Sequence, residues 1–177
     1  MKYILLFLLT VFSAYWIHAQ KNAKINWVSF EDAVKKNEKT PKKFIIDVYT
    51  DWCGWCKKMD KTTFRNPTIV EYINEYFYAI KLNAERTDTV ILGEQIFVNQ
   101  NPNQRRSAHE LAIALLNGKM SYPSIVYLDE NVEMLQAVPG FYDAESIEPI
   151  LHFFGEDIYL SKSWEDYKTA FSSQLKN

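Results

Sequence analysis

The chain has 177 residues, 47% of them hydrophobic and 15% aromatic, which suits one globular domain able to bury its own core. Its formal net charge is −2 and it has no basic stripe, which excludes an electrostatic basis for nucleic-acid binding. Cysteine is scarce, since the chain contains just Cys53 and Cys56.

Residues 1–19 have the pattern of a secretory signal peptide. Lys2 supplies a short positive region, residues 3–14 are apolar but too few for a comfortable membrane span, and Ala19 suits the position before a cut. The alternatives are an uncleaved anchor helix or a buried N-terminal helix. We therefore expect an exported protein, periplasmic or extracellular, that begins near Gln20 and has no membrane insertion after cleavage.

The next elements are a helix and a strand. Ser29, followed three residues later by Asp32, predicts a helix start, and Pro41 blocks continuation of that helix. Residues 44–49 are apolar almost throughout, as is typical of a central strand covered on both faces. Asp47 is the exception. A buried carboxylate is costly without a partner or a role, and the alternative is an acid at a strand edge facing water.

Cys53 and Cys56 lie where this strand leads into a second helix, which we expect to run to about Phe64. A Cys-x-x-Cys disulfide closes a very short loop, so it constrains the unfolded chain little and stabilises the fold weakly. Redox chemistry therefore explains the pair better than structural cross-linking, even in an oxidising compartment. Metal binding is the poorer alternative, because a structural zinc site needs about four ligands.

The rest of the chain continues with strands and helices, which predicts a mixed sheet with helices on both faces. His109 and His152 are expected on ordinary helix surfaces. The expected elements, in chain order, are a helix after Asn66, a strand over 77–82, a hairpin over 90–98, an exposed loop over 99–106, a helix from a Ser107 cap to Gly118, strands over 125–128 and 133–138, and helices over 144–155 and 163–175.

With these elements placed, the chain resembles the thioredoxin superfamily. Residues 52–57 are similar to its Trp-Cys-Gly-x-Cys-Lys active-site segment, Asp47 stands where thioredoxins carry a buried acid, and Tyr122-Pro123 stands at the position of the cis-proline. The segments are also similar to exported thiol:disulfide interchange domains. The resemblance implies an α/β fold, a three-layer α/β/α sandwich with a mixed central sheet. It would form a single domain over 20–177, with a core over about 27–155 and a C-terminal helical extension over about 156–177.

The resemblance also implies roles for the site residues. Cys53 would be the nucleophile, because a helix N-terminus favours its thiolate, and Cys56 would resolve the mixed disulfide. Asp47 would take the Cys56 proton, against the alternative of a purely structural acid. A cis Pro123 would bring the backbone of Tyr122 beside Cys53 to pair with a substrate strand, against the alternative of an ordinary trans proline.

Trp52, Gly54 and Trp55 complete the expected substrate-binding set with Tyr122 and Pro123. Trp52 is expected to pack under the site, whereas Trp55 is expected to offer an apolar docking patch. Two features depart from the family pattern. Trp55 replaces the proline of many thioredoxins, and the stretch 85–118 is longer than a plain thioredoxin needs.

The sequence therefore predicts an exported thiol-disulfide oxidoreductase, more specifically a disulfide reductase, that uses the Cys53–Cys56 couple and no other cofactor or metal. Its substrates would be protein thiols and disulfides, and a membrane electron-donor protein would recharge it. The alternative is a binding or folding-helper module on a thioredoxin scaffold with an inert disulfide. The long 85–118 stretch and the aromatic C-terminus favour that alternative.

Overall fold

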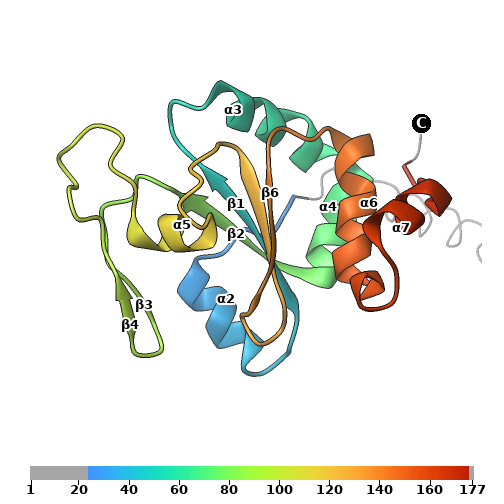
Figure 1. Ribbon diagram of the computed structural model, residues 1–177, viewed down its shortest axis with the longest axis horizontal. Coiled ribbons are helices and arrows are strands. Elements are labelled where there is room, and N and C mark those ends of the chain that lie inside the picture. The colour runs from blue at the N-terminus through green and yellow to red at the C-terminus, as the bar shows by residue number, and fades with distance from the viewer. Residues whose placement is uncertain (1–23, 176–177) are drawn as a thin grey trace, which may run out of the picture.

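The computed structural model describes residues 24–175, so the expected signal segment, residues 1–19, lies outside the described part. Figure 1 shows a central sheet with helices around it. The helices and strands, in chain order, are α2 (Phe30–Asn37), β1 (Lys43–Tyr49), α3 (Gly54–Lys61), the 3₁₀ turn η1 (Thr63–Arg65), α4 (Pro67–Tyr76), β2 (Phe77–Asn83), β3 (Val90–Leu92), β4 (Gln95–Phe97), α5 (Glu110–Leu115), β5 (Ser124–Leu128), β6 (Met134–Pro139), α6 (Ala144–Gly155), the 3₁₀ turn η2 (Ile158–Leu160) and α7 (Trp164–Ala170).

The main sheet is mixed, as expected, with the strand order β2-β1-β5-β6. β1 pairs in parallel with β2 and antiparallel with β5, and β5 pairs antiparallel with β6. β1 is therefore an inner strand, which explains its near-continuous apolar sequence. The register of β1 and β2 places Asp47 opposite Lys81, so these two side chains leave the sheet on the same face.

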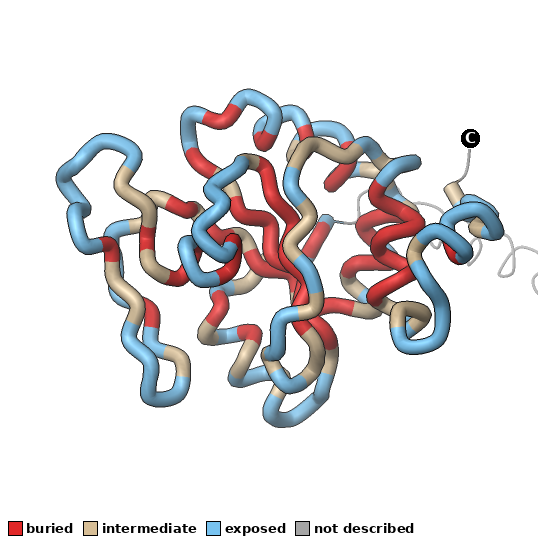
Figure 2. Tube along the Cα trace, viewed as in Figure 1, coloured by how far each residue is buried: buried red, intermediate tan, exposed pale blue. Residues whose placement is uncertain are grey.

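The side chains of β1 alternate between two hydrophobic cores. Ile45 packs into the core that includes residues of α3, α4 and α6, and Phe44 and Ile46 pack into the core that includes residues of α2 and α5. Figure 1 shows these two groups of helices on opposite sides of the sheet, and Figure 2 shows the strands buried between them. Because strand side chains alternate, Asp47 shares the Ile45 face, the one that α3 helps to cover.

Most expected helix starts are present. Ser29 caps α2, Asn66 caps α4 with Pro67 as the first helical residue, and Asp143 caps α6, each by accepting backbone N–H hydrogen bonds with its side chain. α7 is shorter than expected and ends at Ala170. The chain beyond it turns to bind a buried carboxylate, because the backbone N–H of Gln174 donates to Glu148 at 2.6 Å.

Two predictions about α5 and the histidines are wrong. α5 begins after His109, not after Ser107, because the His109 Nδ1 caps the backbone N–H of Leu111 at 3.2 Å. The Ser107 hydroxyl instead donates to Asn99 Oδ1 at 2.6 Å. His109 is fully buried, and so is His152, which stacks 4.0 Å from the Tyr72 ring centroid. Both imidazoles find polar partners inside the protein, which is why burial is tolerated.

The stretch 85–118 forms a lobe that packs against the sheet through buried residues of β3 and α5. Its hairpin, β3–β4, extends away from the body at the left of Figure 1, and α5 lies between that hairpin and the sheet. The loop expected to be exposed over 99–106 is exposed at residues 100–106, but Asn99 is buried, because its amide donates to the carbonyls of Arg86 and Ser107. Within residues 24–175, no helix has the length and apolar character needed to cross a membrane.

Candidate active site

The two cysteines form a disulfide at the start of α3, with an S–S distance of 2.02 Å. Cys53 is the N-cap residue, and its Sγ accepts a hydrogen bond from the backbone N–H of Cys56 at 3.0 Å. Both residues are buried, with 5% and 2% of their surface exposed. The unpaired N–H groups and the positive end of the helix dipole favour negative charge at the Cys53 sulfur, so this sulfur is suited to become the thiolate of the reduced pair.

Asp47 lies beneath the helix that carries the cysteines, on the sheet face that α3 covers. It is 1% exposed, and its Oδ2 lies 2.8 Å from the Nζ of Lys81 on β2. Burial raises the pKa of Asp47 to about 6, because it disfavours the carboxylate, while the ammonium of Lys81 acts in the opposite direction. A carboxyl group with a pKa near 6 can exchange protons close to neutral pH, as a general acid or base must.

Lys81 connects Asp47 to a second carboxylate. Its ammonium also contacts Asp60, which lies on α3 one turn after Cys56. Burial lowers the pKa of Lys81, but the two carboxylates outweigh that effect and the pKa is raised overall. Lys81 therefore stays charged, and its charge limits the rise in the pKa of Asp47 that burial causes. Neither Lys81 nor Asp60 was predicted from the sequence as part of the site. The signal for Lys81 was present, since it is the one charged residue in the expected strand over 77–82.

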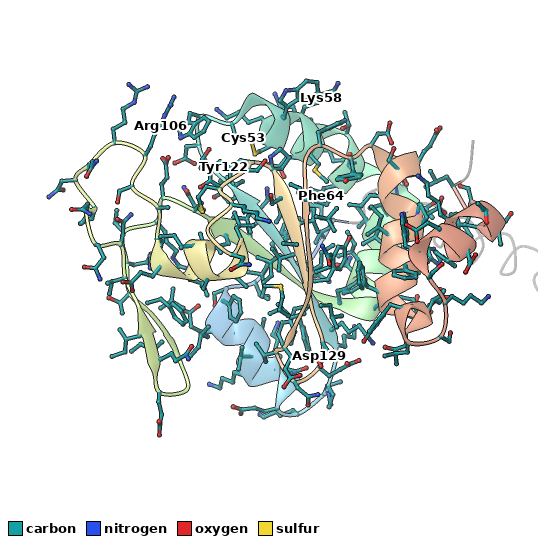
Figure 3. All side chains as sticks on the ribbon, in the orientation of Figure 1. Cys53, Lys58, Phe64, Arg106, Tyr122 and Asp129 are labelled. Carbon is teal, nitrogen blue, oxygen red and sulfur yellow. A yellow bond between two sulfur atoms is a disulfide. The ribbon has the colours of Figure 1, made fainter. Side chains whose placement is uncertain are left out.

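Pro123 follows a cis peptide bond, Tyr122-Pro123. It immediately precedes β5, and the register pairs Ser124 with Val48 near the end of β1. The Tyr122-Pro123 turn therefore lies at the same end of the sheet as the cysteines, and Figure 3 shows Tyr122 close to Cys53. A glycine at position 54 leaves the approach open, because a Cβ built there would meet no atom within 4 Å.

Trp52 does not pack under the site, so that prediction is wrong. It is 50% exposed, and its indole is held from the side by residues far away in the sequence. Its Nε1 donates to Glu85 Oε1 at 2.8 Å, its ring meets the Tyr122 ring edge-on at 5.9 Å, and the Arg106 guanidinium lies 4.6 Å from its centroid. Neither Glu85 nor Arg106 carried a local sequence signal.

Trp55 is on the other side of the sulfurs and is 57% exposed. Its ring centroid lies 5.2 Å from that of Phe141, and the Lys58 ammonium lies over both rings at 4.8 and 4.9 Å. Lys58 thus contributes a cation–π contact in addition to facing solvent. Two exposed indoles therefore flank a buried disulfide, an arrangement that offers apolar surface to a second protein.

The comparisons with known proteins bear on the family and the fold. Residues 30–155 match the family model of the thioredoxin-like domain. A thiol:disulfide interchange protein, DsbD, of Photorhabdus laumondii is 26% identical over 121 residues, which are 67% of this chain and 17% of that protein. The chain therefore spans less than a fifth of the length of that relative.

Two solved structures share the fold. One is an oxidoreductase named DsbH, with a TM-score of 0.55 and 14% identity, covering 77% of this chain and 88% of its own. The other is a thioredoxin-fold protein from Helicobacter pylori, with a TM-score of 0.55 and 21% identity, covering 73% of this chain and 79% of its own.

Proposed function

This chain belongs to the thioredoxin-like domain family, and from that premise we propose that it is an exported disulfide reductase that acts on protein substrates. One observation carries the proposal: Cys53 Sγ is the N-cap of α3 and accepts the N–H of its own redox partner, Cys56. This places one sulfur where a thiolate is stabilised and the second sulfur one helical turn further on, where it can resolve a mixed disulfide.

The reduction would proceed in two exchange steps. The Cys53 thiolate attacks one sulfur of the substrate disulfide, so a mixed disulfide forms and the other substrate sulfur leaves as a thiolate that takes up a proton. The Cys56 thiol then loses its proton and attacks the Cys53 sulfur. This releases the second substrate thiol and leaves Cys53–Cys56 oxidised. Two electrons have passed to the substrate.

Asp47 is proposed as the group that accepts the Cys56 proton in the second step. It lies on the sheet face under α3, and burial brings its pKa to about 6, close to the range where proton transfer at neutral pH is efficient. Lys81 would act as a positioning residue, because its 2.8 Å contact holds the carboxylate and limits the rise in its pKa.

After each cycle the oxidised pair needs two electrons and two protons from a donor. A membrane electron-donor protein is the proposed source, since an exported protein is separated from soluble cytoplasmic reductants. The relative named thiol:disulfide interchange protein supports the class of reaction. The signal-like pattern of residues 1–19 supports the compartment, periplasmic or extracellular.

The proposal is tested with insulin and a catalytic amount of the protein, with dithiothreitol as the reductant that restores the Cys53–Cys56 dithiol after each turnover. We expect catalysed reduction of the insulin disulfides, complete loss of turnover in Cys53→Ser, and accumulation of a stable mixed disulfide in Cys56→Ala. Turnover that survives Cys53→Ser would overturn the proposal. A protein that never reduces insulin, but still captures partners after both cysteines are replaced by serine, would instead be a binding module with an inert disulfide.

A further inference from the structure

Residues 85–106 return to the active site at both ends, a feature that the redox chemistry leaves unexplained. At the first end, Glu85 accepts the hydrogen bond of the Trp52 indole. At the second end, Arg106 stacks on the same ring. Trp52 directly precedes Cys53, so both ends meet one residue away from the reacting sulfur. Figure 3 shows Arg106, Tyr122 and Cys53 gathered in one corner of the molecule.

The position of Arg106 is fixed by its neighbours. Asn99 is buried and donates through its amide to the carbonyls of Arg86 at 3.1 Å and Ser107 at 2.8 Å. Its oxygen accepts the Ser107 hydroxyl, so this single side chain clamps the loop beside Arg106. Arg106 itself has φ +63°, a left-handed conformation that is uncommon for residues other than glycine and persists where the surroundings hold it.

The charge of Arg106 is available to a partner. Within residues 24–175, no carboxylate oxygen lies within 4 Å of its guanidinium. Glu85 lies at the edge of the same indole, where it accepts from Trp52, and it forms no ion pair with Arg106. A guanidinium that stacks through its face still presents its N–H donors in the plane of the group, where they can bind a carboxylate in a bidentate manner.

We propose that Arg106 determines specificity by binding a carboxylate next to the reactive disulfide of the partner. The preferred substrates are then proteins with acidic residues flanking their cysteines. This rests on the proposed reductase function and names its substrate class. Arg105 and the two lysines after the motif, Lys57 and Lys58, are also exposed, so with Arg106 four exposed cations outnumber the two acids beside Trp52, Asp51 and Glu85. Such a surface complements an acidic partner and speeds the encounter with it.

The main test uses two synthetic peptides, each closed by one disulfide and reduced in the presence of dithiothreitol. They are identical except for the residues that flank both cysteines, which are glutamate in one peptide and glutamine in the other. A third peptide with lysine at these positions is used with Arg106→Glu. We expect the full chain to reduce the glutamate peptide with a kcat/KM about fivefold higher, the scale of one exposed ion pair. The preference should vanish in Arg106→Gln, invert in favour of a lysine-flanked peptide in Arg106→Glu, and weaken at high salt.

Arg105→Gln is the matched control, because it removes the same charge from the neighbouring residue, for which no contact with Trp52 is found in residues 24–175. It should keep most of the preference, and it should reduce the glutamine peptide at the wild-type rate. Equal rates for the two peptides in the wild type, or equal losses in the two variants, would overturn the inference while leaving the reductase function intact. Failure to reduce either peptide or insulin would overturn both.

Discussion

The buried half of the active site and its exposed rim are built in different ways. The buried half consists of Cys53, Cys56, Asp47 and Lys81, which come from β1, β2 and the start of α3. The rim consists of Trp52, Trp55, Tyr122, Glu85 and Arg106, which come mostly from loops. Glu85, Tyr122 and Arg106 meet at Trp52 from distant parts of the sequence, and Trp55 packs against Phe141. In this protein, strands and a helix hold the reacting groups, whereas loops supply most of the surface that a partner would recognise.

The largest effect is expected from Asp47→Asn, which removes the proposed base of the buried half. Reduction of insulin should slow about 100-fold, the usual scale for loss of a general base. The wild-type rate should rise as pH passes through about 6, where Asp47 loses its proton, and the variant should lack that rise. Initial rates between about pH 5 and 8 measure both. Asp60→Asn is the control, since it removes the more exposed carboxylate at Lys81; an equal loss there would argue against a special role for Asp47.

Asp47→Asn should slow the reaction, but it should increase the free energy of unfolding at pH 7. The pKa of Asp47 is raised from its ordinary 3.8 to about 6, so between these values the folded protein binds more protons than the unfolded one. Stability from this group is therefore present at low pH and is lost as pH rises through 6, by up to about 3 kcal/mol. Asp47→Asn should be more stable than wild type at pH 7 and lose that advantage near pH 4. Urea unfolding of the oxidised proteins at the two pH values checks the sign.

The rim should respond to Asn99→Ala without a change in the chemistry. Removing this buried amide leaves the carbonyls of Arg86 and Ser107 without their donor and should cost about 2 kcal/mol in unfolding free energy. The preference for glutamate-flanked peptides should be lost. The rate on the glutamine peptide should stay within about twofold of wild type, because the rim and the reacting groups are expected to act independently. Asn101→Ala, an exposed neighbour, is the control. A slowed reaction on both peptides would show that rim and buried half are coupled.

The smallest effect is expected from Trp55→Ala. Its exposed indole should contribute binding that is equal in the ground and transition states, so KM for insulin should rise about threefold with little change in kcat. Ile96→Ala removes an equally exposed apolar side chain on β4 and should leave KM unchanged. Steady-state kinetics of the two variants compare them directly. A fall in kcat would instead show that Trp55 contributes to the reaction step, as the residues of the buried half do.

The sequence predicted the buried half well, because that half follows local rules. The apolar run of β1, the N-cap of α4 at Asn66 and the cysteines at a strand-helix junction are all short-range patterns, and each is present in the structure. The family resemblance added the proline turn before β5. Even the contact between Asp47 and Lys81 needed only the register of two strands that were both expected.

The rim could not be predicted in this way. The exposure of Trp52 depends on Glu85 and Arg106, which fold back from a stretch with no regular pattern. His109 looked like a surface residue because its position before a helix is ordinary, yet its Nε2 reaches the Asp88 carbonyl at 3.0 Å and the ring is enclosed by the lobe. Long-range loop contacts of this kind are set by tertiary packing, and helix or strand periodicity contains no information about them.

Both ends of residues 85–106 contact the Trp52 indole, which affects how freely this stretch can vary between related proteins. A loop whose two ends are pinned at one point can grow, shrink or change its sequence between the pins at little entropic cost. Changes to the exposed tip of the β3–β4 hairpin or to the exposed turn after it would leave the core intact, whereas Val90 on β3 is buried in the core shared with β1 and β2. Substitutions in the exposed part of residues 85–106 can therefore change the substrate preference, while the residues that carry out disulfide exchange stay the same.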